Sequence, residues 1–160
     1  MVYKTRKPPV TVGVKALSNF VKLPSYETEH SVGMDLYAAI DWPIIIPRSK
    51  FNLQDNMAII PCGISVSLPI GFELQIRPRS GLAARHHITV LNTPGTIDSD
   101  YRGEIKVILI NHSKMEGFRV NPGDRIAQMV PQMVPQIEWD LKEELDDTTR
   151  GSDGFGSTGV

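Results

Sequence analysis

Two carboxylates and a tyrosine stand close together in the segment LNTPGTIDSDYRGE, residues 91–104. Asp98 follows the apolar Ile97, so we expect its carboxylate to be held rigidly near the end of a strand. A carboxylate held in this way can act as a general base on a water molecule. Asp100 and the ring of Tyr101 follow within three residues. The pattern fits an Asx-rich turn with a packed tyrosine equally well, and the segment alone leaves both interpretations open.

A second segment, RPRSGLAARH at 77–86, has the residue types that bind an anion. Arg79 and Ser80 offer donors, and the composition predicts a short helix over 80–86 with Ser80 as its cap. Ser80 and Gly81 then lie at a helix N-terminus, whose free N–H groups and partial positive charge attract phosphate. A plain capped helix with Arg79 as a surface charge is the alternative.

The segment RGSDGFGSTGV, residues 150–160, combines an arginine, a phenylalanine and several glycines. The planar guanidinium of Arg150 suits phosphate, the glycines let backbone N–H groups approach an anion, and Phe155 can stack on a base. GFGSTG matches the dinucleotide fingerprint by its letters only, because that motif needs a preceding strand and a following helix. The lysine of a P-loop is also missing. A flap that closes over a nucleotide and a solvated Gly/Ser tail both remain open.

Other potential sites are weaker. Asp35, in SVGMDLYAA at 31–39, can satisfy backbone donors inside the fold or orient waters around a metal ion. The four histidines lack the spacing of a zinc site, and Cys62 is the only cysteine, which excludes a cysteine-built zinc site. The absence of a G-x-S-x-G segment disfavours a serine hydrolase.

The bulk composition is that of one ordinary globular domain. The chain has 160 residues, of which 41% are hydrophobic and 22% charged. A net charge of -1 argues against broad binding to nucleic acid or to membranes, and we find neither an apolar run of membrane-spanning length nor a signal peptide. One cysteine permits no disulfide within the chain, so we expect a reducing, cytoplasmic setting, with the nucleus or an organelle also open.

Short strands have to position these residues, because 12 prolines and 13 glycines leave little room for long helices. Runs rich in valine and isoleucine predict strands at 44–46, 59–68, 72–76, 105–111 and 125–130. The run at 105–111 is more continuously apolar than the alternating residues 64–68, so both of its faces are expected to be covered. Many short strands between turn signals predict an all-β barrel or jelly roll with one short helix.

The end of the chain has its own organisation. QMVPQMVPQ, at 128–136, contains a four-residue duplication and is interpreted as a strand broken by edge prolines. The acidic stretch 138–147 fits a short helix or a solvated linker, and we favour the linker. We therefore divide the chain into a β-barrel at 1–148 and a flexible glycine-rich flap at 149–160.

The order of these segments is more specific than any one of them. SVGMDLYAA, PRSGLA, NTPGTIDSDYRG, GDRIAQMV and RGSDGFGSTG, in this order, resemble the five motifs of the homotrimeric dUTPases. The resemblance covers residues 14–158. It implies a distorted jelly-roll barrel, a homotrimer with three shared active sites, and magnesium-assisted hydrolysis of dUTP to dUMP and diphosphate. Such an activity keeps uracil out of DNA and supplies dUMP for thymidylate synthesis.

The resemblance also implies a role for each potential site residue. Asp98 would activate the water that attacks the α-phosphorus, Tyr101 would exclude a 2′-hydroxyl, and Asp35 would hold waters of the triphosphate's Mg²⁺. The uracil would be recognised by Asn92, Gly95, Thr96 and Ile97. The phosphates and the rest of the substrate would be held by Arg79, Ser80, Gly81, Lys106 and Gln128. The flap would supply Arg150, Phe155, Gly156, Ser157 and Thr158.

Departures from the family pattern are few. Asp153 stands where the family often has a small residue, and the duplication after the fourth motif indicates altered edge packing. The alternatives are a dCTP deaminase of the same fold and a non-catalytic trimeric binding module. The intact IDSDY segment and the complete flap favour hydrolysis over both.

Overall fold

The computed structural model describes residues 10–18, 21–49 and 56–152. Within these residues the chain forms eleven short strands and one helix, as the sequence predicted for an all-β protein with a single short helix. None of the described residues forms a helix long and apolar enough to cross a membrane. The elements are β1 (Gly13–Ala16), β2 (Met34–Tyr37), β3 (Ile44–Ile46), β4 (Met57–Pro61), β5 (Ile64–Ser67), β6 (Phe72–Arg77), α1 (Ser80–His86), β7 (Ile88–Val90), β8 (Gly95–Ile97), β9 (Lys106–Asn111), β10 (Phe118–Val120) and β11 (Arg125–Met133).

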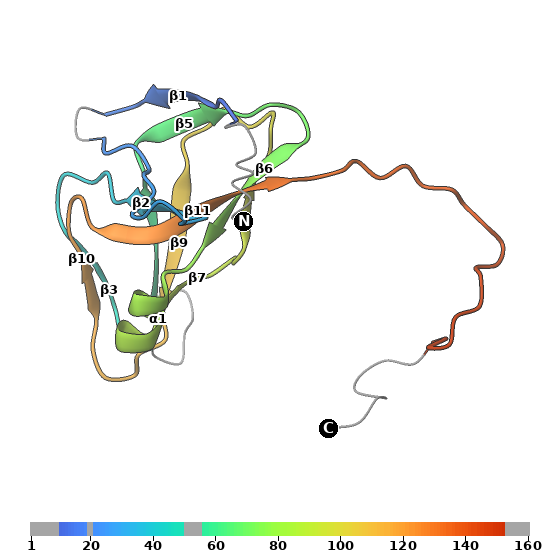
Figure 1. Cartoon of the computed structure of the whole chain (residues 1–160). Coiled ribbons are helices and arrows are strands. Elements are labelled where there is room, and N and C mark those ends of the chain that lie inside the picture. The colour runs from blue at the N-terminus through green and yellow to red at the C-terminus, as the bar shows by residue number, and fades with distance from the viewer. Residues whose placement is uncertain (1–9, 19–20, 50–55, 153–160) are drawn as a thin grey trace, which may run out of the picture.

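All strand pairs are antiparallel and form two main sheets with two smaller ribbons. One main sheet has the order β2-β11-β6-β8 and the other β4-β9-β7, while β1 pairs with β5 and β10 with β3. The strands wrap around a common interior, with the β1–β5 ribbon at one end and α1 towards the opposite end (Figure 1). The arrangement is a small, irregular β-barrel.

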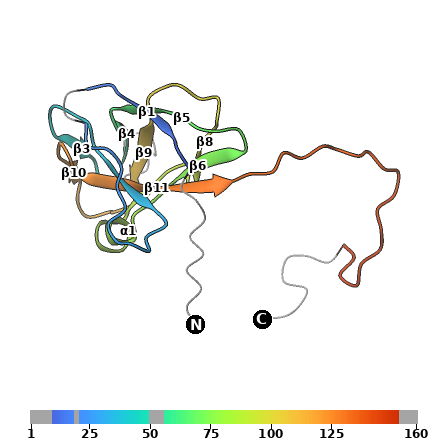
Figure 2. The ribbon, with the colours of Figure 1, turned by 45° about the horizontal axis from the view of Figure 1, so that its top comes forward.

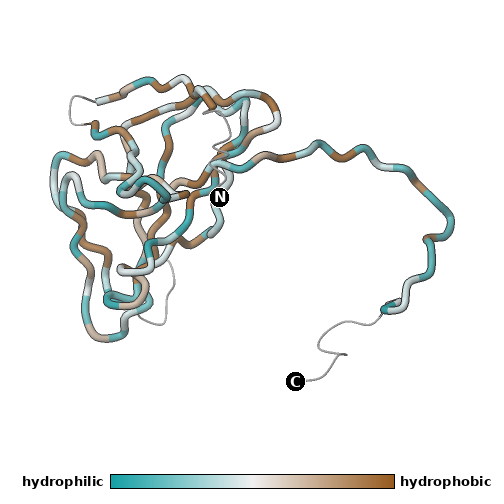
Figure 3. Tube along the Cα trace, viewed as in Figure 1, coloured by the Kyte–Doolittle hydropathy of each residue, from teal (hydrophilic) through white to brown (hydrophobic). Residues whose placement is uncertain are grey.

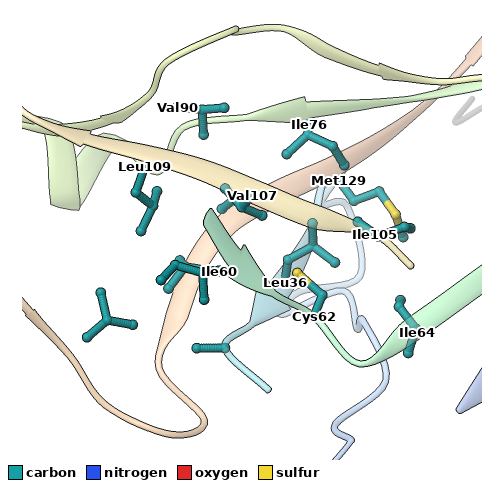
Figure 4. Packing of buried hydrophobic residues seen from close by; sticks show 14 of the residues in the cluster. Leu36, Ile60, Cys62, Ile64, Ile76, Val90, Ile105, Val107, Leu109 and Met129 are labelled. Atoms are coloured by element: carbon teal, nitrogen blue, oxygen red, sulfur yellow. The ribbon is translucent and has the colours of Figure 1, made fainter. Parts of the chain in front are cut away.

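The core lies between the two main sheets. Leu36 of β2, Ile60 of β4 and Val107 of β9 are each at most 1% exposed, and their side chains meet in the interior seen in Figure 4. Burying each such side chain contributes about 1.5–3 kcal/mol. The expectation of a covered strand near 105–111 is confirmed, because only Lys106 is exposed and only Ile108 is half-buried in β9. This core fixes the strands whose ends carry the polar residues.

The predicted strand at 59–68 is wrong as a single element. The structure divides it into β4, which pairs with β9, and β5, which pairs with β1. The break falls at Gly63, whose φ of +68 belongs to the left-handed region. A Cβ atom at Gly63 would lie 2.7 Å from Cγ2 of Val21 and 2.8 Å from Cβ of Ala39. Only glycine therefore allows the chain to turn there from one sheet into the other.

The strand at the duplicated QMVP segment continues through its first proline. β11 extends to Met133 and pairs with β6 across Pro131, so the prediction that this proline breaks the strand is wrong. The predicted edge position is confirmed within the described part of the chain, because the pairing of β11 with β2 ends at Met129 and no described strand pairs with the other side of Pro131.

Beyond β11, residues 134–152 run away from the barrel as an exposed arm without helix (Figures 1 and 2). This agrees with the predicted linker at 138–147. The arm is not uniformly polar, however, because apolar and polar stretches follow one another along it (Figure 3). Ile137, Trp139 and Leu141 are 72%, 88% and 99% exposed. Most of the predicted flap, from Asp153 onwards, lies outside the described residues.

Candidate active site

A pocket of about 260 Å³ opens beside β8 and β9. Its walls combine apolar isoleucines with a tyrosine and with both signs of charge. The lining residues are Ile59, Thr96, Ile97, Asp98, Tyr101, Glu104, Lys106 and Ile108. An apolar cavity with a few convergent polar groups is the usual form of a small-molecule site.

Asp98 follows β8 and begins a tight turn. Its carbonyl oxygen accepts a hydrogen bond from the N–H of Tyr101 at 3.2 Å. Arg102 closes the turn from outside, since its Nη1 donates to the carbonyls of Ser99 at 2.7 Å and Tyr101 at 2.9 Å. The Asp98 carboxylate is exposed and has no hydrogen-bond partner among the described residues. The turn that the sequence predicted as one of its two interpretations is therefore present. It leaves the carboxylate available to a water molecule.

Tyr101 is held by its own loop. Its hydroxyl donates to the carbonyl oxygen of Glu104 at 3.0 Å. The ring packs so closely over Gly103 that a Cβ there would collide with the tyrosine. The residue remains 42% exposed, so its ring presents a rigid, accessible face at the pocket.

Asn92 lies beside Gly95 at the start of β8. A Cβ atom at Gly95 would lie 3.2 Å from Nδ2 of Asn92 and 3.4 Å from Cβ of Ile76. Glycine thus lets the Asn92 amide approach the strand backbone closely. The exposed amide and the backbone of Gly95–Ile97 together offer both donors and acceptors, which a base edge requires.

A separate ionic cluster is centred on Asp35 of β2. Its side chain is 2% exposed and accepts from Nε of Arg79 at 3.1 Å and from Nη1 of Arg125 at 3.2 Å. Arg125 also lies 3.5 Å from Oε2 of Glu27. Arg79 donates in addition to the carbonyl of Arg125 at 3.3 Å. The cluster pairs two cations with two anions and holds the guanidinium of Arg79 in place.

The local backbone explains this geometry. The pairing of β11 with β2 shifts register between Arg125 and Ala127, and such a bulge redirects a side chain at the end of a strand. Beyond the bulge, Gln128 pairs with Asp35 in the β11–β2 register and is half-buried. Asp35, Arg79 and Gln128 are therefore neighbours in space.

The helix has the predicted bounds, Ser80–His86, but not the predicted cap. Arg79 is the N-cap residue, and no side chain makes a capping hydrogen bond. The reason is that the extended backbone of Arg79 directs its carbonyl to the N–H groups of Leu82 and Ala83, both at 3.0 Å. Ser80 is consequently the first helical residue, with an exposed hydroxyl, and Gly81 follows it half-buried.

The predicted site residues thus form two groups in one chain. The pocket contains Asp98, Tyr101, Lys106 and their β8 neighbours, whereas the ionic cluster contains Asp35, Arg79 and Gln128. β2 and β8 are the outer strands of the order β2-β11-β6-β8, and three strand spacings separate them by about 14 Å. Arg150 is exposed on the arm. Phe155, Gly156, Ser157 and Thr158 lie outside the described residues.

Sequence reasoning missed four contributors. Arg125 and Glu104 stand inside the quoted motifs GDRIAQMV and YRGE, so the motifs held a signal that spacing alone did not resolve. Ile59 and Ile108 are pocket walls that come from β4 and β9. No local pattern distinguishes them from other core isoleucines.

The residues are compatible with Mg²⁺ that is bound by a phosphate ligand. No group of three metal-ligating side chains occurs among the described residues, so they form no protein cage for the ion. The oxygens of Asp35 each accept one arginine donor, and a carboxylate oxygen can accept a second hydrogen bond. Because two guanidiniums lie against this carboxylate, Asp35 suits contact with Mg²⁺ through metal-bound water better than direct coordination of the cation.

The fold and these two groups define a class: an antiparallel β-barrel with a carboxylate-bearing pocket and an arginine cluster suited to a phosphate-containing ligand. The sequence pattern of the dUTPase family matches residues 19–159. The chain belongs to the dUTPase family.

Comparison with individual proteins leads to the same family. The chain is 54% identical over 155 residues to the deoxyuridine 5′-triphosphate nucleotidohydrolase of Maricaulis maris (strain MCS10), with 94% of this chain and 97% of the relative covered. It is 57% identical over 150 residues to that of Rickettsia bellii (strain OSU 85-389), with 93% and 95% covered. The fold is similar to the dUTPase of Staphylococcus bacteriophage 80alpha with dUPNHPP, at a TM-score of 0.83, 24% identity, and coverage of 94% and 99%.

Proposed function

We propose that the chain is a dUTP diphosphatase, which hydrolyses dUTP to dUMP and diphosphate in the pocket beside β8 and β9. The observation that carries the proposal is the position of Asp98 in a member of the dUTPase family. Its carboxylate is exposed in a pocket, held by a rigid turn, and accepts no hydrogen bond from the described residues. This is the arrangement that a general base requires.

In the proposed reaction Asp98 removes a proton from a water molecule. The water oxygen bonds to the α-phosphorus, the bond from that phosphorus to the bridging oxygen breaks, and diphosphate leaves with the electron pair. Because the proton stays on the carboxylate until the products leave, the base returns to its ionised state by exchange with solvent. Correct placement of the water contributes most of the effect, since phosphoryl transfer depends mainly on positioning and charge stabilisation.

Substrate selection is assigned to the residues around β8. Asn92 and the backbone of Gly95, Thr96 and Ile97 would pair with the uracil edge. Tyr101 would lie under the deoxyribose and leave no room for a 2′-hydroxyl. Its hydrogen bond to Glu104 and its close contact with Gly103 support this role, because a ring that is fixed in place can exclude an atom more strictly than a mobile one.

The charged end of the substrate is assigned to the ionic cluster and to Lys106. Arg79, Ser80, Gly81 and Gln128 would hold phosphates, and Asp35 would hold waters of the Mg²⁺ that is bound to the triphosphate. The ion would supply charge stabilisation for the transferred group. The support in this chain is the fixed guanidinium of Arg79 beside the buried Asp35.

We further propose that each site is assembled from several copies in a homotrimer. The first support is the separation of about 14 Å between the outer strands β2 and β8. Within one chain, the pocket residues and the ionic cluster are not brought together. The second support is the arm. Ile137, Trp139 and Leu141 are mostly exposed in the single chain, and covering such side chains contributes about 1.5–3 kcal/mol each.

The arm would also carry the flap residues to the active site of another copy. The arm, which includes the exposed Arg150, runs away from the barrel in both views (Figures 1 and 2). On another copy Arg150 would reach the γ-phosphate, Phe155 would stack over uracil, and Gly156, Ser157 and Thr158 would surround the phosphates. Closure of such a flap excludes water and completes the site. A flap at 149–160 and a cytoplasmic location remain predictions.

Subunit mixing tests the composite site. Asp98→Asn and Arg79→Ala are each expected to be nearly inactive as homotrimers. When the two are unfolded together at equal concentrations and refolded, random assembly of sites that take the two residues from different copies restores both in about a quarter of the sites. A mixture that stays at the sum of the two separate activities contradicts the shared site. Mixing each variant with itself is the control.

A further inference from the structure

Glu104 joins three parts of the pocket wall. Its carbonyl oxygen accepts the Tyr101 hydroxyl at 3.0 Å. Its Oε1 accepts the backbone N–H of Gly63 at 3.0 Å, and its Oε2 lies 3.8 Å from Nζ of Lys106. The residue lines the pocket and its side chain is 26% exposed. Through its backbone carbonyl and its carboxylate, this one residue connects the Tyr101 loop, the start of β9 and the turn between β4 and β5.

The Gly63 turn is a rigid anchor. Gly63 is buried and its carbonyl accepts from the N–H of Leu17 at 2.7 Å. The flanking backbone is bound to Ile105 on both sides, by Cys62 N–H at 3.0 Å and by Ile64 carbonyl at 2.8 Å. The steric limits at Gly63 allow no larger residue there. Because its N–H is buried and its acceptor is the Glu104 carboxylate, losing that carboxylate leaves a buried donor unpaired.

We propose that Glu104 is a positioning residue that fixes Tyr101 against the pocket, through the hydrogen bond of its carboxylate to Gly63. The same residue supplies the carbonyl that holds the Tyr101 hydroxyl, so any shift of Glu104 is transmitted directly to the ring. The inference rests on the proposed role of Tyr101 in excluding a 2′-hydroxyl. Glu104 therefore contributes to selection of the deoxyribose through the position of the Tyr101 ring.

The link to Lys106 is the weaker of the two. The separation of 3.8 Å is long, and the Lys106 side chain is 53% exposed, so solvent screens the pair. The bond to Gly63 is shorter and lies beside the core. This difference lets substitutions separate the two contacts. Glutamine keeps an oxygen that accepts from Gly63 and loses the charge that faces Lys106, whereas alanine loses both contacts.

The test compares kcat/KM for dUTP and for UTP in the wild type, Glu104→Ala and Glu104→Gln. We expect Glu104→Ala to reduce the dUTP:UTP ratio by about tenfold, and Glu104→Gln to stay within about twofold of the wild type. Rescue by glutamine is the result that a charge effect on Lys106 cannot give. Equal losses in both variants, or an unchanged ratio in Glu104→Ala, would overturn the proposal.

Two further measurements keep the result interpretable. Tyr101→Ala is assayed in parallel: if it leaves the ratio unchanged, the proposed role of Tyr101 fails and this inference fails with it. If Tyr101→Ala lowers the ratio and Glu104→Ala does not, the positioning role of Glu104 is refuted and the role of Tyr101 stands. Amide hydrogen exchange at Gly63 reports the hydrogen bond itself, and we expect faster exchange in Glu104→Ala than in Glu104→Gln. Should the alanine variant fail to assemble, Glu104→Asp, whose carboxylate is one methylene too short, takes its place.

Discussion

Replacing Asp35 with asparagine tests the ionic cluster most severely, because it changes a charge and almost no volume. The carboxylate is 2% exposed and holds Arg79 and Arg125, one on each oxygen. In Asp35→Asn the amide oxygen still accepts from one guanidinium. The amide NH₂ faces the other guanidinium, so that arginine meets a donor where it had an acceptor.

The structure sets the size of this effect. A hydrogen bond to a charged group contributes about 1.5–3 kcal/mol, and removing one partner of a buried ion pair costs about 3–5 kcal/mol. The arginine side chains are 24% and 45% exposed, so solvent compensates part of the loss. We therefore expect Asp35→Asn to lower the free energy of unfolding by about 2–4 kcal/mol.

Urea unfolding followed by circular dichroism measures this value. The protein concentration has to be the same for every variant, because an oligomer gains stability with concentration. The exposed Asp41 provides the matched control, and Asp41→Asn is expected to change the stability by less than about 0.5 kcal/mol. If Asp35→Asn costs no more than Asp41→Asn, the cluster does not hold Arg79, and the phosphate role assigned to that arginine loses its support.

Three other changes test other parts of the molecule. Deleting 149–160 is expected to leave the circular dichroism spectrum and the oligomer unchanged while lowering kcat/KM for dUTP by about a hundredfold, and near-normal turnover would remove the flap from the mechanism. Tyr101→Ala is expected to raise activity on UTP relative to dUTP, and an unchanged preference would assign sugar selection to another residue. Burial, and secondarily the charge of Glu104, raise the pKa of the Cys62 thiol from 9.0 to about 12. The folded state therefore holds this proton more tightly than the unfolded chain. The resulting contribution of Cys62 to the free energy of unfolding is complete below pH 9 and is lost as the pH rises towards 12. Urea unfolding should show the stability of the wild type falling relative to Cys62→Ala by about 1.4 kcal/mol per pH unit above 9, and parallel profiles would refute the raised pKa.

Local features were predicted well from the sequence. The helix at Ser80–His86 and the strand at Ile44–Ile46 have the expected bounds, because a run of helix-forming residues and a run of isoleucines between prolines each depend on neighbours in the chain. The break at Gly63 was missed for the opposite reason. It depends on Val21 and Ala39, which are distant in sequence and reach Gly63 only in the fold.

The site divides in the same way. Asp98 and Tyr101 are three residues apart, and the segment between them already indicated a turn beside a possible base. The partners of Asp35 lie 44 and 90 positions along the chain, so no spacing rule connects them. For Ser80 the sequence predicted a cap from residue type alone, whereas the cap position is decided by the backbone conformation of Arg79. Motif order supplied what local patterns did not, including the functional class.

The most direct test of the central claim is magnesium-dependent diphosphate release from dUTP, dCTP, dTTP and UTP by the wild type and by Asp98→Asn. The account predicts rapid release from dUTP alone, and its loss in Asp98→Asn while that variant still binds dUTP, because the substitution removes the base and keeps the shape of the pocket. An Asp98→Asn protein that turns over dUTP at the wild-type rate, or a wild type that releases ammonia from dCTP instead, would contradict it.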